Sequence, residues 1–284
     1  MTDTSKNLHV AREWLAHLDL TFGPRQHKTA MLHAEHVGPL RVQRPFYPEA
    51  DGCCHIYLLH PPGGMVIGDQ LKLSVNARPY SHVLLTTPSA GKIYGAKGAS
   101  EIQSQTINID IDDACVEWLP QETIAFNGAN GVLATHINLR NNGKYFGWDI
   151  VRLGRVASGE VFNVGRCLQH LEVWRDGVPY FIEKNRMEAN APIQTATWGL
   201  QGKNTSGTLL ATLIVTRDMI DELLEELSIN ALSHWGLTQK KDIFIARYLG
   251  DSVSECRQGF EMIWRRIRPL LNGKAAITPR IWNT

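Results

Sequence analysis

The chain has 284 residues, and its 29 Lys and Arg residues nearly balance its 28 Asp and Glu residues, which gives a formal net charge of +1 at pH 7. This balance argues against a globally basic surface of the kind that binds nucleic acid. The length fits two average domains or one large all-β domain. Either arrangement buries enough surface to be stable without a disulfide or a metal ion.

The sequence has no signal for secretion or membrane insertion. The N-terminal stretch MTDTSKNLHVAREW lacks the apolar core of a signal peptide, and apolar runs such as TLLATLIV are too short to span a bilayer. The five cysteines are odd in number and have no C-x-x-C spacing, which predicts reduced thiols. We therefore expect a cytoplasmic protein without membrane attachment, whose residues 1–15 form a flexible N-terminus.

Short segments of alternating apolar and polar residues dominate the chain from about residue 17 to residue 215. In HLDLTF, for example, Leu18, Leu20 and Phe22 alternate with polar residues, and in QTINIDI every second residue is isoleucine from the third position on. This period of two is typical of half-buried strands. A dozen or more such strands, separated by turn-rich gaps, favour a sandwich, barrel or solenoid over βαβ units.

Two turn motifs punctuate this region. HPPGGMVIGD, residues 60–69, links the apolar run CCHIYLLH to the alternating run QLKLSVNA, and its prolines and glycines predict a structural corner. A nucleotide-binding loop is disfavoured because the chain has neither a G-x-G-x-x-G that leads from a strand into a helix nor a G-x-x-x-x-G-K-[ST] motif. Further along, Asp176-Gly177 predicts a tight hairpin turn.

Two helices are expected in the last third of the chain, near residues 218–231 and 252–268. RDMIDELLEELSINAL has an apolar helical stripe, with Asp218 available as its N-cap. SVSECRQGFEMIWRRIRPLL has a second stripe, and Pro269 is expected to mark its end. Because DIFIARYL between them resembles a strand, we expect both helices to pack on the β body.

Several residues could carry chemistry. Asp149 and Glu160 flank a polar strand pair and could form the acid/base pair of a hydrolase. Cys53 and His55 share a face of a predicted strand and could ligate a metal ion. Three histidines of HKTAMLHAEH form another short cluster: His27, His33 and His36. Neither cluster has a recognised metal spacing, so buried thiols and hydrogen-bonded histidines are the favoured interpretation.

Seven motifs, in this order, closely resemble the urease accessory protein UreD family, called UreH in some bacteria. They are HVGPLRVQRPFYPE, HIYLLHPPGGMVIGDQL, LLTTPSAGKIY, EWLPQETIAFNGAN, WDIVRLGR, SGEVF, and RPLL with PRIW. The resemblance runs from about Leu18 to the last residues. One departure is SAGKIYGAKG, where Lys92 and Tyr94 match the family's Gly-Ala-Thr-Lys-Phe-Tyr-Arg-Ser-like run but the residues after Tyr94 do not.

The resemblance implies a fold and a function. The fold is a single domain over residues 1–284, mainly β, with a β-helix-like stack of many short strands and two α-helices in the C-terminal third. The function is non-catalytic: a scaffold that binds apo-urease on one side and UreF on the other, while UreF holds the GTPase UreG, which brings nickel. No tightly bound cofactor is expected, only Ni²⁺ in transit to the dinuclear site of urease.

The resemblance further implies an internal channel. Thiolate and imidazole ligands would hold Ni²⁺ tightly, whereas spaced carboxylates, carbonyls and water let an ion step onward. Four acids on the matching β segments are therefore candidates for a transient nickel path: Asp69, Asp149, Glu160 and Glu183. Each could equally make an internal hydrogen bond or lie on a solvated rim.

Two other functions stay open from the residues alone, an all-β ligand-binding module and a hydrolase that uses Asp149 and Glu160. For the scaffold, the helical region from Asp218 to Leu271 is the expected side for UreF, because a helix face is a ready docking surface. Arg265 and Arg266 in this region are expected to be exposed.

Overall fold

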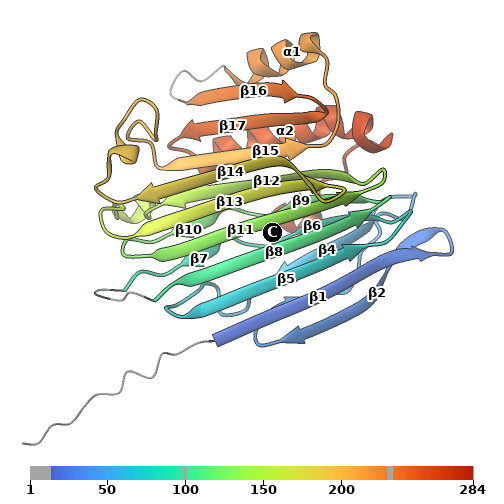
Figure 1. Cartoon of the computed structure of the whole chain (residues 1–284), viewed down its shortest axis with the longest axis horizontal. Helices are drawn as coiled ribbons and strands as arrows, with labels where there is room; N and C mark the ends of the chain where they lie inside the picture. The colour runs from blue at the N-terminus through green and yellow to red at the C-terminus, as the bar shows by residue number, and fades with distance from the viewer. Residues whose placement is uncertain (1–13, 97, 99–100, 229–232, 284) are drawn as a thin grey trace, which may run out of the picture.

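The computed structural model describes residues 14–96, 98, 101–228 and 233–283, and within them the fold is mainly β. Two large sheets lie face to face (Figure 1). The first sheet has the spatial order β14 (Val178–Glu188), β13 (Arg166–Arg175), β11 (Asn130–Arg140), β8 (Gln103–Asp112), β5 (Asp69–Ala77), β1 (Trp14–Arg25) and β2 (Lys28–Val37).

The second sheet carries the remaining strands. Its order is β16 (His234–Lys240), β17 (Ile243–Gly250), β15 (Thr205–Ala211), β12 (Lys144–Leu153), β9 (Cys115–Leu119), β6 (His82–Thr86), β4 (Cys54–Leu59) and β3 (Arg41–Val42). Two short strands, β10 (Thr123–Ala125) and β7 (Gly91–Ile93), extend it beside β12.

The chain crosses repeatedly between the sheets: β4, β6, β9 and β12 belong to the second, whereas β5, β8, β11 and β13 belong to the first. Neighbours from successive crossings pair in parallel, as β5 does with β8 and β6 does with β9. Antiparallel pairs occur at the ends of the sheets, for example β1 with β2 and β13 with β14. The predicted mainly β class is confirmed, while the β-helix-like stack stays a prediction of the resemblance.

The main apolar core lies between the two sheets. Leu18, Leu20 and Phe22 of β1 are buried there, and so are the alternate isoleucines of β8. Side chains on successive strand positions point to opposite faces, so each alternating segment supplies one buried row. The period-two interpretation of these segments is confirmed.

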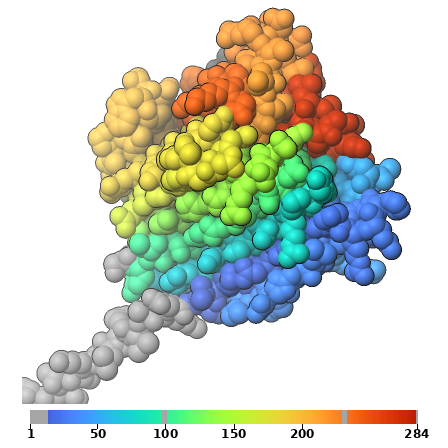
Figure 2. All heavy atoms as spheres, turned by 45° about the vertical axis from the view of Figure 1, so that its right-hand side comes forward, coloured from blue at the N-terminus to red at the C-terminus, as the bar shows by residue number. Residues whose placement is uncertain are grey.

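Two α-helices, α1 (Arg217–Leu227) and α2 (Val253–Asn272), pack through their apolar stripes against the second sheet (Figure 1). They confirm the two predicted helices. In the space-filling view, α1 and the C-terminal segment lie at one end of the molecule (Figure 2). Three short 3-10 helices complete the described fold: η1 (Val156–Ser158), η2 (Pro192–Gln194) and η3 (Arg280–Asn283).

Three details of the helices and the N-terminus differ from prediction. The N-cap of α1 is Thr216, whose side chain accepts from Met219 N, and Asp218 lies in the first turn, where its charge favours the helix N-terminus. α2 continues through Pro269 to Asn272, with Gly273 as its left-handed C-cap, because a proline in a last turn removes only one backbone donor. Of the predicted flexible N-terminus, residues 1–13 lie outside the described residues, and Trp14 already belongs to β1. Of the predicted first helix, residues 229–231 also lie outside the described residues.

The predicted turns are confirmed. Asp176 and Gly177 have φ values of 49° and 78°, both positive, as a tight hairpin turn between β13 and β14 requires. The segment 60–68 is a corner that carries the chain from β4 of the second sheet to β5 of the first. All five cysteines are buried and free. None of the helices in the described part of the chain has the length and apolar character to cross a membrane.

Candidate functional site

A cavity of about 130 Å³ lies between the two sheets. Most of its wall is apolar, but polar side chains of several strands also line it, among them Gln105 (β8), Thr135 (β11), Asp149 (β12), Gln169 (β13), Thr123 (β10) and the basic Lys92 (β7). Strand alternation places them there. Thr135 shares a face of β11 with the buried Leu133, while Asp149 faces the cavity because its neighbour Trp148 faces α2.

Asp149 is the carboxyl group of this cavity. Its Oδ2 accepts a hydrogen bond of 3.0 Å from Thr135 Oγ1, and its Oδ1 accepts one of 3.4 Å from Trp118 Nε1. The side chain lies deep inside the protein but is not fully enclosed, since it forms part of the cavity wall. No ion pair with Asp149 occurs among the described residues. The carboxyl group is therefore internal and forms no ion pair with a described residue, while the basic Lys92 lines the same cavity.

The pKa of Asp149 reflects this environment. Burial raises the pKa, the two hydrogen-bond donors lower it, and the charge of Glu183 raises it further, so that the net pKa is above its ordinary value. A cation that reaches this carboxyl group would stabilise its charged form.

Glu183 approaches the same region from β14 of the opposite sheet. Its Oε1 accepts hydrogen bonds of 2.8 Å from Thr208 Oγ1 and 3.2 Å from Asn185 Nδ2. Thr208 is the register partner of Asp149 across β12 and β15, and Asn185 Nδ2 also donates to the cavity-lining Gln169 over 3.2 Å. The structure thus brings two of the predicted acids together. We call this group of neighbouring side chains the Asp149–Glu183 path: Asp149, Thr208, Glu183, Asn185 and Gln169.

The other two predicted acids have different surroundings. Asp69 is buried at the start of β5, where its Oδ2 accepts a 2.8 Å hydrogen bond from Val66 N and so closes the 60–68 corner. Its charge also acts on the cavity-lining His60, whose pKa is lowered by burial against the opposing effect of Asp69. Glu160 accepts from Asn127 N, and one of its oxygens accepts from two Arg155 nitrogens at 3.1 and 2.7 Å. It is not among the residues that line the cavity.

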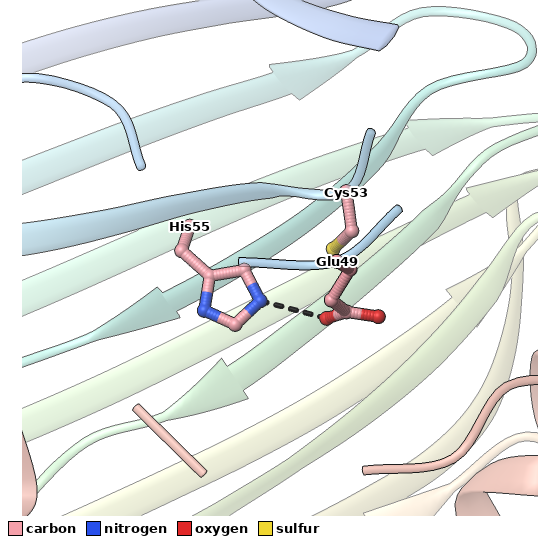
Figure 3. A group of neighbouring side chains, drawn as sticks. All are labelled: Glu49, Cys53 and His55. Carbon is pink, nitrogen blue, oxygen red and sulfur yellow. Dashed lines mark hydrogen bonds and ion pairs between the residues drawn. The ribbon is translucent and has the colours of Figure 1, made fainter. Parts of the chain in front are cut away.

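A second polar site lies between the second sheet and α2, and it contains Cys53 and His55. His55 Nε2 and Glu49 Oε1 are 2.7 Å apart, and Figure 3 shows these two side chains facing one another beside the Cys53 thiol. A neighbouring set of Cys53, His82 and Glu117 also places its ligand atoms within 4.8 Å of one another. By residue type, either set could hold a metal ion.

The guanidinium of Arg268, from α2, connects the two sets. It donates to Glu49 Oε1 over 2.8 Å and to Oε2 over 3.0 Å, and its Nε donates to the Glu117 carboxylate over 2.9 and 3.0 Å. Trp264 Nε1 donates to Glu117 Oε2 over 2.6 Å. We call this group the Arg268 cluster: Glu49, Cys53, His55, His82, Glu117, Trp264 and Arg268.

The charges in the Arg268 cluster are matched by its own members. Burial alone would raise the pKa of Glu49, but hydrogen bonds from His55 and Arg268 outweigh it and lower the pKa to about 2. Burial alone would lower the pKa of His82, but contacts with Cys115, Cys53 and Glu117 outweigh it and raise that pKa well above its ordinary value. Two carboxylates therefore face one guanidinium and one imidazolium.

This arrangement does not fit a metal ion. A cation would have to displace the buried guanidinium of Arg268, and burial raises the pKa of the Cys53 thiol to about 12, which disfavours the thiolate that metals bind. The favoured interpretation of the Cys53 and His55 pattern, a buried thiol and a hydrogen-bonded histidine, agrees with this geometry. The histidines of HKTAMLHAEH lie on or next to β2, and His27, His33 and His36 are exposed.

Sequence reasoning missed most of the Arg268 cluster. Glu49 and Arg268 are 219 residues apart, and Glu117 is 151 residues from Arg268, so no local spacing connects them. The one available signal was the position of Arg268 in the second helical pattern, four residues after Trp264 and thus on the same apolar face. A charged residue at a core position indicates a buried partner.

The fold and the cavity define the class of the protein: a mainly β protein with an internal carboxyl group in a cavity and a helix fixed to the outer face of one sheet. Comparison with known proteins gives the family. The sequence profile described as UreD urease accessory protein matches residues 15–283. The chain therefore belongs to the UreD family of urease accessory proteins, and this membership places it in urease maturation rather than among enzymes.

Individual relatives agree with the profile. The urease accessory protein UreD of Saccharophagus degradans is 58% identical over 277 residues, which cover 96% of this chain and 94% of the relative. The UreD proteins of Pseudoalteromonas translucida and Chromohalobacter salexigens are 41% and 39% identical, and each match covers 96% of this chain and at least 90% of the relative.

Proposed function

We propose that this chain is a non-catalytic scaffold of urease maturation in the cytoplasm. It binds apo-urease and the UreF–UreG assembly and passes Ni²⁺ through its interior toward the urease active site. Family membership supports the maturation role. The observation that supports the nickel path is Asp149, an internal carboxyl group in a cavity wall with no cationic partner among the described residues.

The Asp149–Glu183 path has the ligand chemistry of a conduit. It offers carboxylate, hydroxyl and amide oxygens, and Ni²⁺ binds such oxygens more weakly than thiolate or imidazole. Its acids are already hydrogen-bonded to neighbours, as Glu183 is to Thr208 and Asn185, so a departing ion leaves these acceptors satisfied. The path can therefore hand an ion on rather than retain it.

The alternative functions have less support. A hydrolase would need Glu160 as a free acid or base, but this carboxylate is occupied by Arg155 and Asn127. A saccharide-binding module would need exposed aromatic platforms. Of the eight tryptophans, Trp14 and Trp198 are at least half exposed, with 50% and 72% of their surface accessible, whereas Trp148 and Trp264 belong to the core.

The side of the molecule formed by α1 and α2 is the proposed surface for UreF. Arg265 is 52% exposed and pairs with Glu261 of its own helix, so its charge is available to a partner. Arg266 pairs instead with Glu222 and Glu226 of α1 and fixes the two helices to each other. Arg265→Glu is therefore the cleaner test, and we expect it to weaken UreF capture while the melting temperature stays unchanged. Unchanged UreF capture by this variant would show that Arg265 is not part of the UreF interface.

The proposed function is tested by deleting the gene in a cell that expresses urease and measuring nickel in the purified urease. We expect urease polypeptides at normal abundance with little nickel and little activity, and recovery of both when the chain is returned. The purified chain should capture UreF and apo-urease and release no ammonia from urea. Fully nickel-loaded urease from the deletion strain would contradict the proposal.

A further inference from the structure

The Asp149–Glu183 path ends at an ion pair that bridges the two sheets. Glu183 lies on β14, the edge strand of the first sheet, and Arg247 lies on β17 of the second. Arg247 Nε donates to Glu183 Oε2 over 2.9 Å, and a second guanidinium nitrogen donates to the same oxygen. In Figure 2 the yellow surface of β14 lies beside the orange-red surface of β16 and β17.

The two partners of this ion pair differ in exposure. The Glu183 side chain is 13% exposed, and its other oxygen faces the interior, where Thr208 and Asn185 donate to it. The Arg247 side chain is 47% exposed. The Glu183 carboxylate thus lies between the interior donors Thr208 and Asn185 and a guanidinium that is close to solvent.

A guanidinium at this place has a direct effect on a cation that arrives from inside. Arginine stays protonated at any physiological pH, so Arg247 neutralises Glu183 permanently while the pair is closed. A divalent cation that approaches Glu183 then meets a like charge within a few ångströms and competes for the same oxygen. The pair occupies the last carboxylate ligand of the path.

We propose that Arg247 is the stopper of the Asp149–Glu183 path: it holds Glu183 in an ion pair at the seam between β14 and β17, and a divalent cation can use Glu183 only when the guanidinium swings outward. This inference rests on the proposed nickel path and adds its regulation. A partner that supplies an acidic group near β17 would draw Arg247 away from Glu183 and so open the path where it docks.

The test is Ni²⁺ binding to the purified full chain by titration calorimetry, with Asp149→Asn defining the binding that belongs to the path. Arg247→Gln frees Glu183 and should raise the path-dependent affinity by about fivefold or more, a usual size for coupling between two sites. Arg247→Met, which keeps the aliphatic stem, should do the same. The double variant Arg247→Gln with Glu183→Gln should lose the gain, and Arg247→Lys, which keeps the charge, should bind as the wild type does.

The matched control is Arg186→Gln, because Arg186 is also an exposed arginine that pairs with an acid, Glu188, but points away from the path on β14. It should leave the affinity unchanged. If Arg247→Gln and Arg247→Met bind Ni²⁺ as the wild type does while Asp149→Asn reduces binding, the proposed role of Arg247 is wrong, but the proposed nickel path is not contradicted. If Asp149→Asn leaves Ni²⁺ binding unchanged in the wild type and in the Arg247 variants, both the proposed nickel path and the proposed role of Arg247 are wrong.

Discussion

Arg268 is the residue on which most of the buried charge depends. Its side chain is fully buried and faces the carboxylates of Glu49 and Glu117, so Arg268→Met would leave Glu49 without its guanidinium partner and Glu117 with His82 alone. We expect this variant to lose about 3–5 kcal/mol of unfolding free energy, the usual cost of breaking a buried pair by removing one partner. Urea denaturation at pH 7 measures it.

The matched control for this variant is Arg265→Met on the same helix. Arg265 is 52% exposed, and its ion pair with Glu261 is screened by water, so its loss should change the unfolding free energy by about 0.5 kcal/mol or less. Equal losses for the two variants would show that the Arg268 cluster does not fix α2 to the sheet.

Unlike Arg268, Asp149 is expected to lower the unfolding free energy at neutral pH. Because its pKa is raised in the fold, ionisation is easier in the unfolded chain, and the charged form opposes folding at neutral pH. We expect Asp149→Asn to keep or increase the unfolding free energy at pH 7, and the difference from the wild type to shrink as the pH falls below about 4. A loss of about 1–3 kcal/mol at pH 7 would instead indicate a purely structural hydrogen-bonding role.

At the scale of elements, contact between β15 and α2 depends on Gly207. A Cβ atom at this position would lie 2.6 Å from Cys256 Sγ and 2.8 Å from the ring of Phe260. Gly207→Ala should therefore push α2 away and lower the unfolding free energy by about 1–3 kcal/mol, as overpacking does. Thermal and urea denaturation measure the loss.

Gly236 on β16 provides the control, since a Cβ there would meet no atom within 4 Å and its backbone is not in the left-handed region. Gly236→Ala should cause no loss of stability, because the substitution only reduces the freedom of the unfolded chain. A comparable loss at both positions would mean that crowding against α2 is not the cause.

Elements were predictable from the sequence where one local pattern decides the outcome. The alternation around Leu18 and the Asp176-Gly177 turn both depend on neighbouring residues, and both match the structure. The end of α2 did not follow its local signal, because Pro269 is tolerated in the last turn while Arg268 and Leu271 still pack on the sheet. Tertiary contacts there outweigh a helix-breaking residue.

At the scale of the whole molecule, single acids can be predicted from the sequence but their partners cannot. Asp149 stands out locally because Trp148 and Ile150 beside it are apolar, which indicates burial. That Glu183 lies near it depends on β12 and β14 belonging to opposite sheets, and no periodicity contains this information. Long-range pairing therefore decides which acids form the path and which, like Glu160, bind a neighbouring loop.

Two groups of internal acids among the described residues differ in how their charge is compensated. In the Arg268 cluster, Glu49 and Glu117 are compensated by the fully buried guanidinium of Arg268 together with His82. In the Asp149–Glu183 path, one acid has no cation among the described residues and the other is paired with an exposed arginine. This contrast favours the path, rather than the cluster with the more metal-like residue types, as the place through which a cation can move.

The most direct measurement is nickel per urease active site after maturation with Asp149→Asn, Glu183→Gln or the control Glu188→Gln in place of the wild-type chain. Glu188 is a partly exposed acid of β14, paired with Arg186 outside the path. We expect Asp149→Asn and Glu183→Gln to fold, to capture UreF and apo-urease, and to yield urease with severalfold less nickel, whereas Glu188→Gln should yield normally loaded urease. Full nickel loading with both path variants would contradict the proposed nickel path.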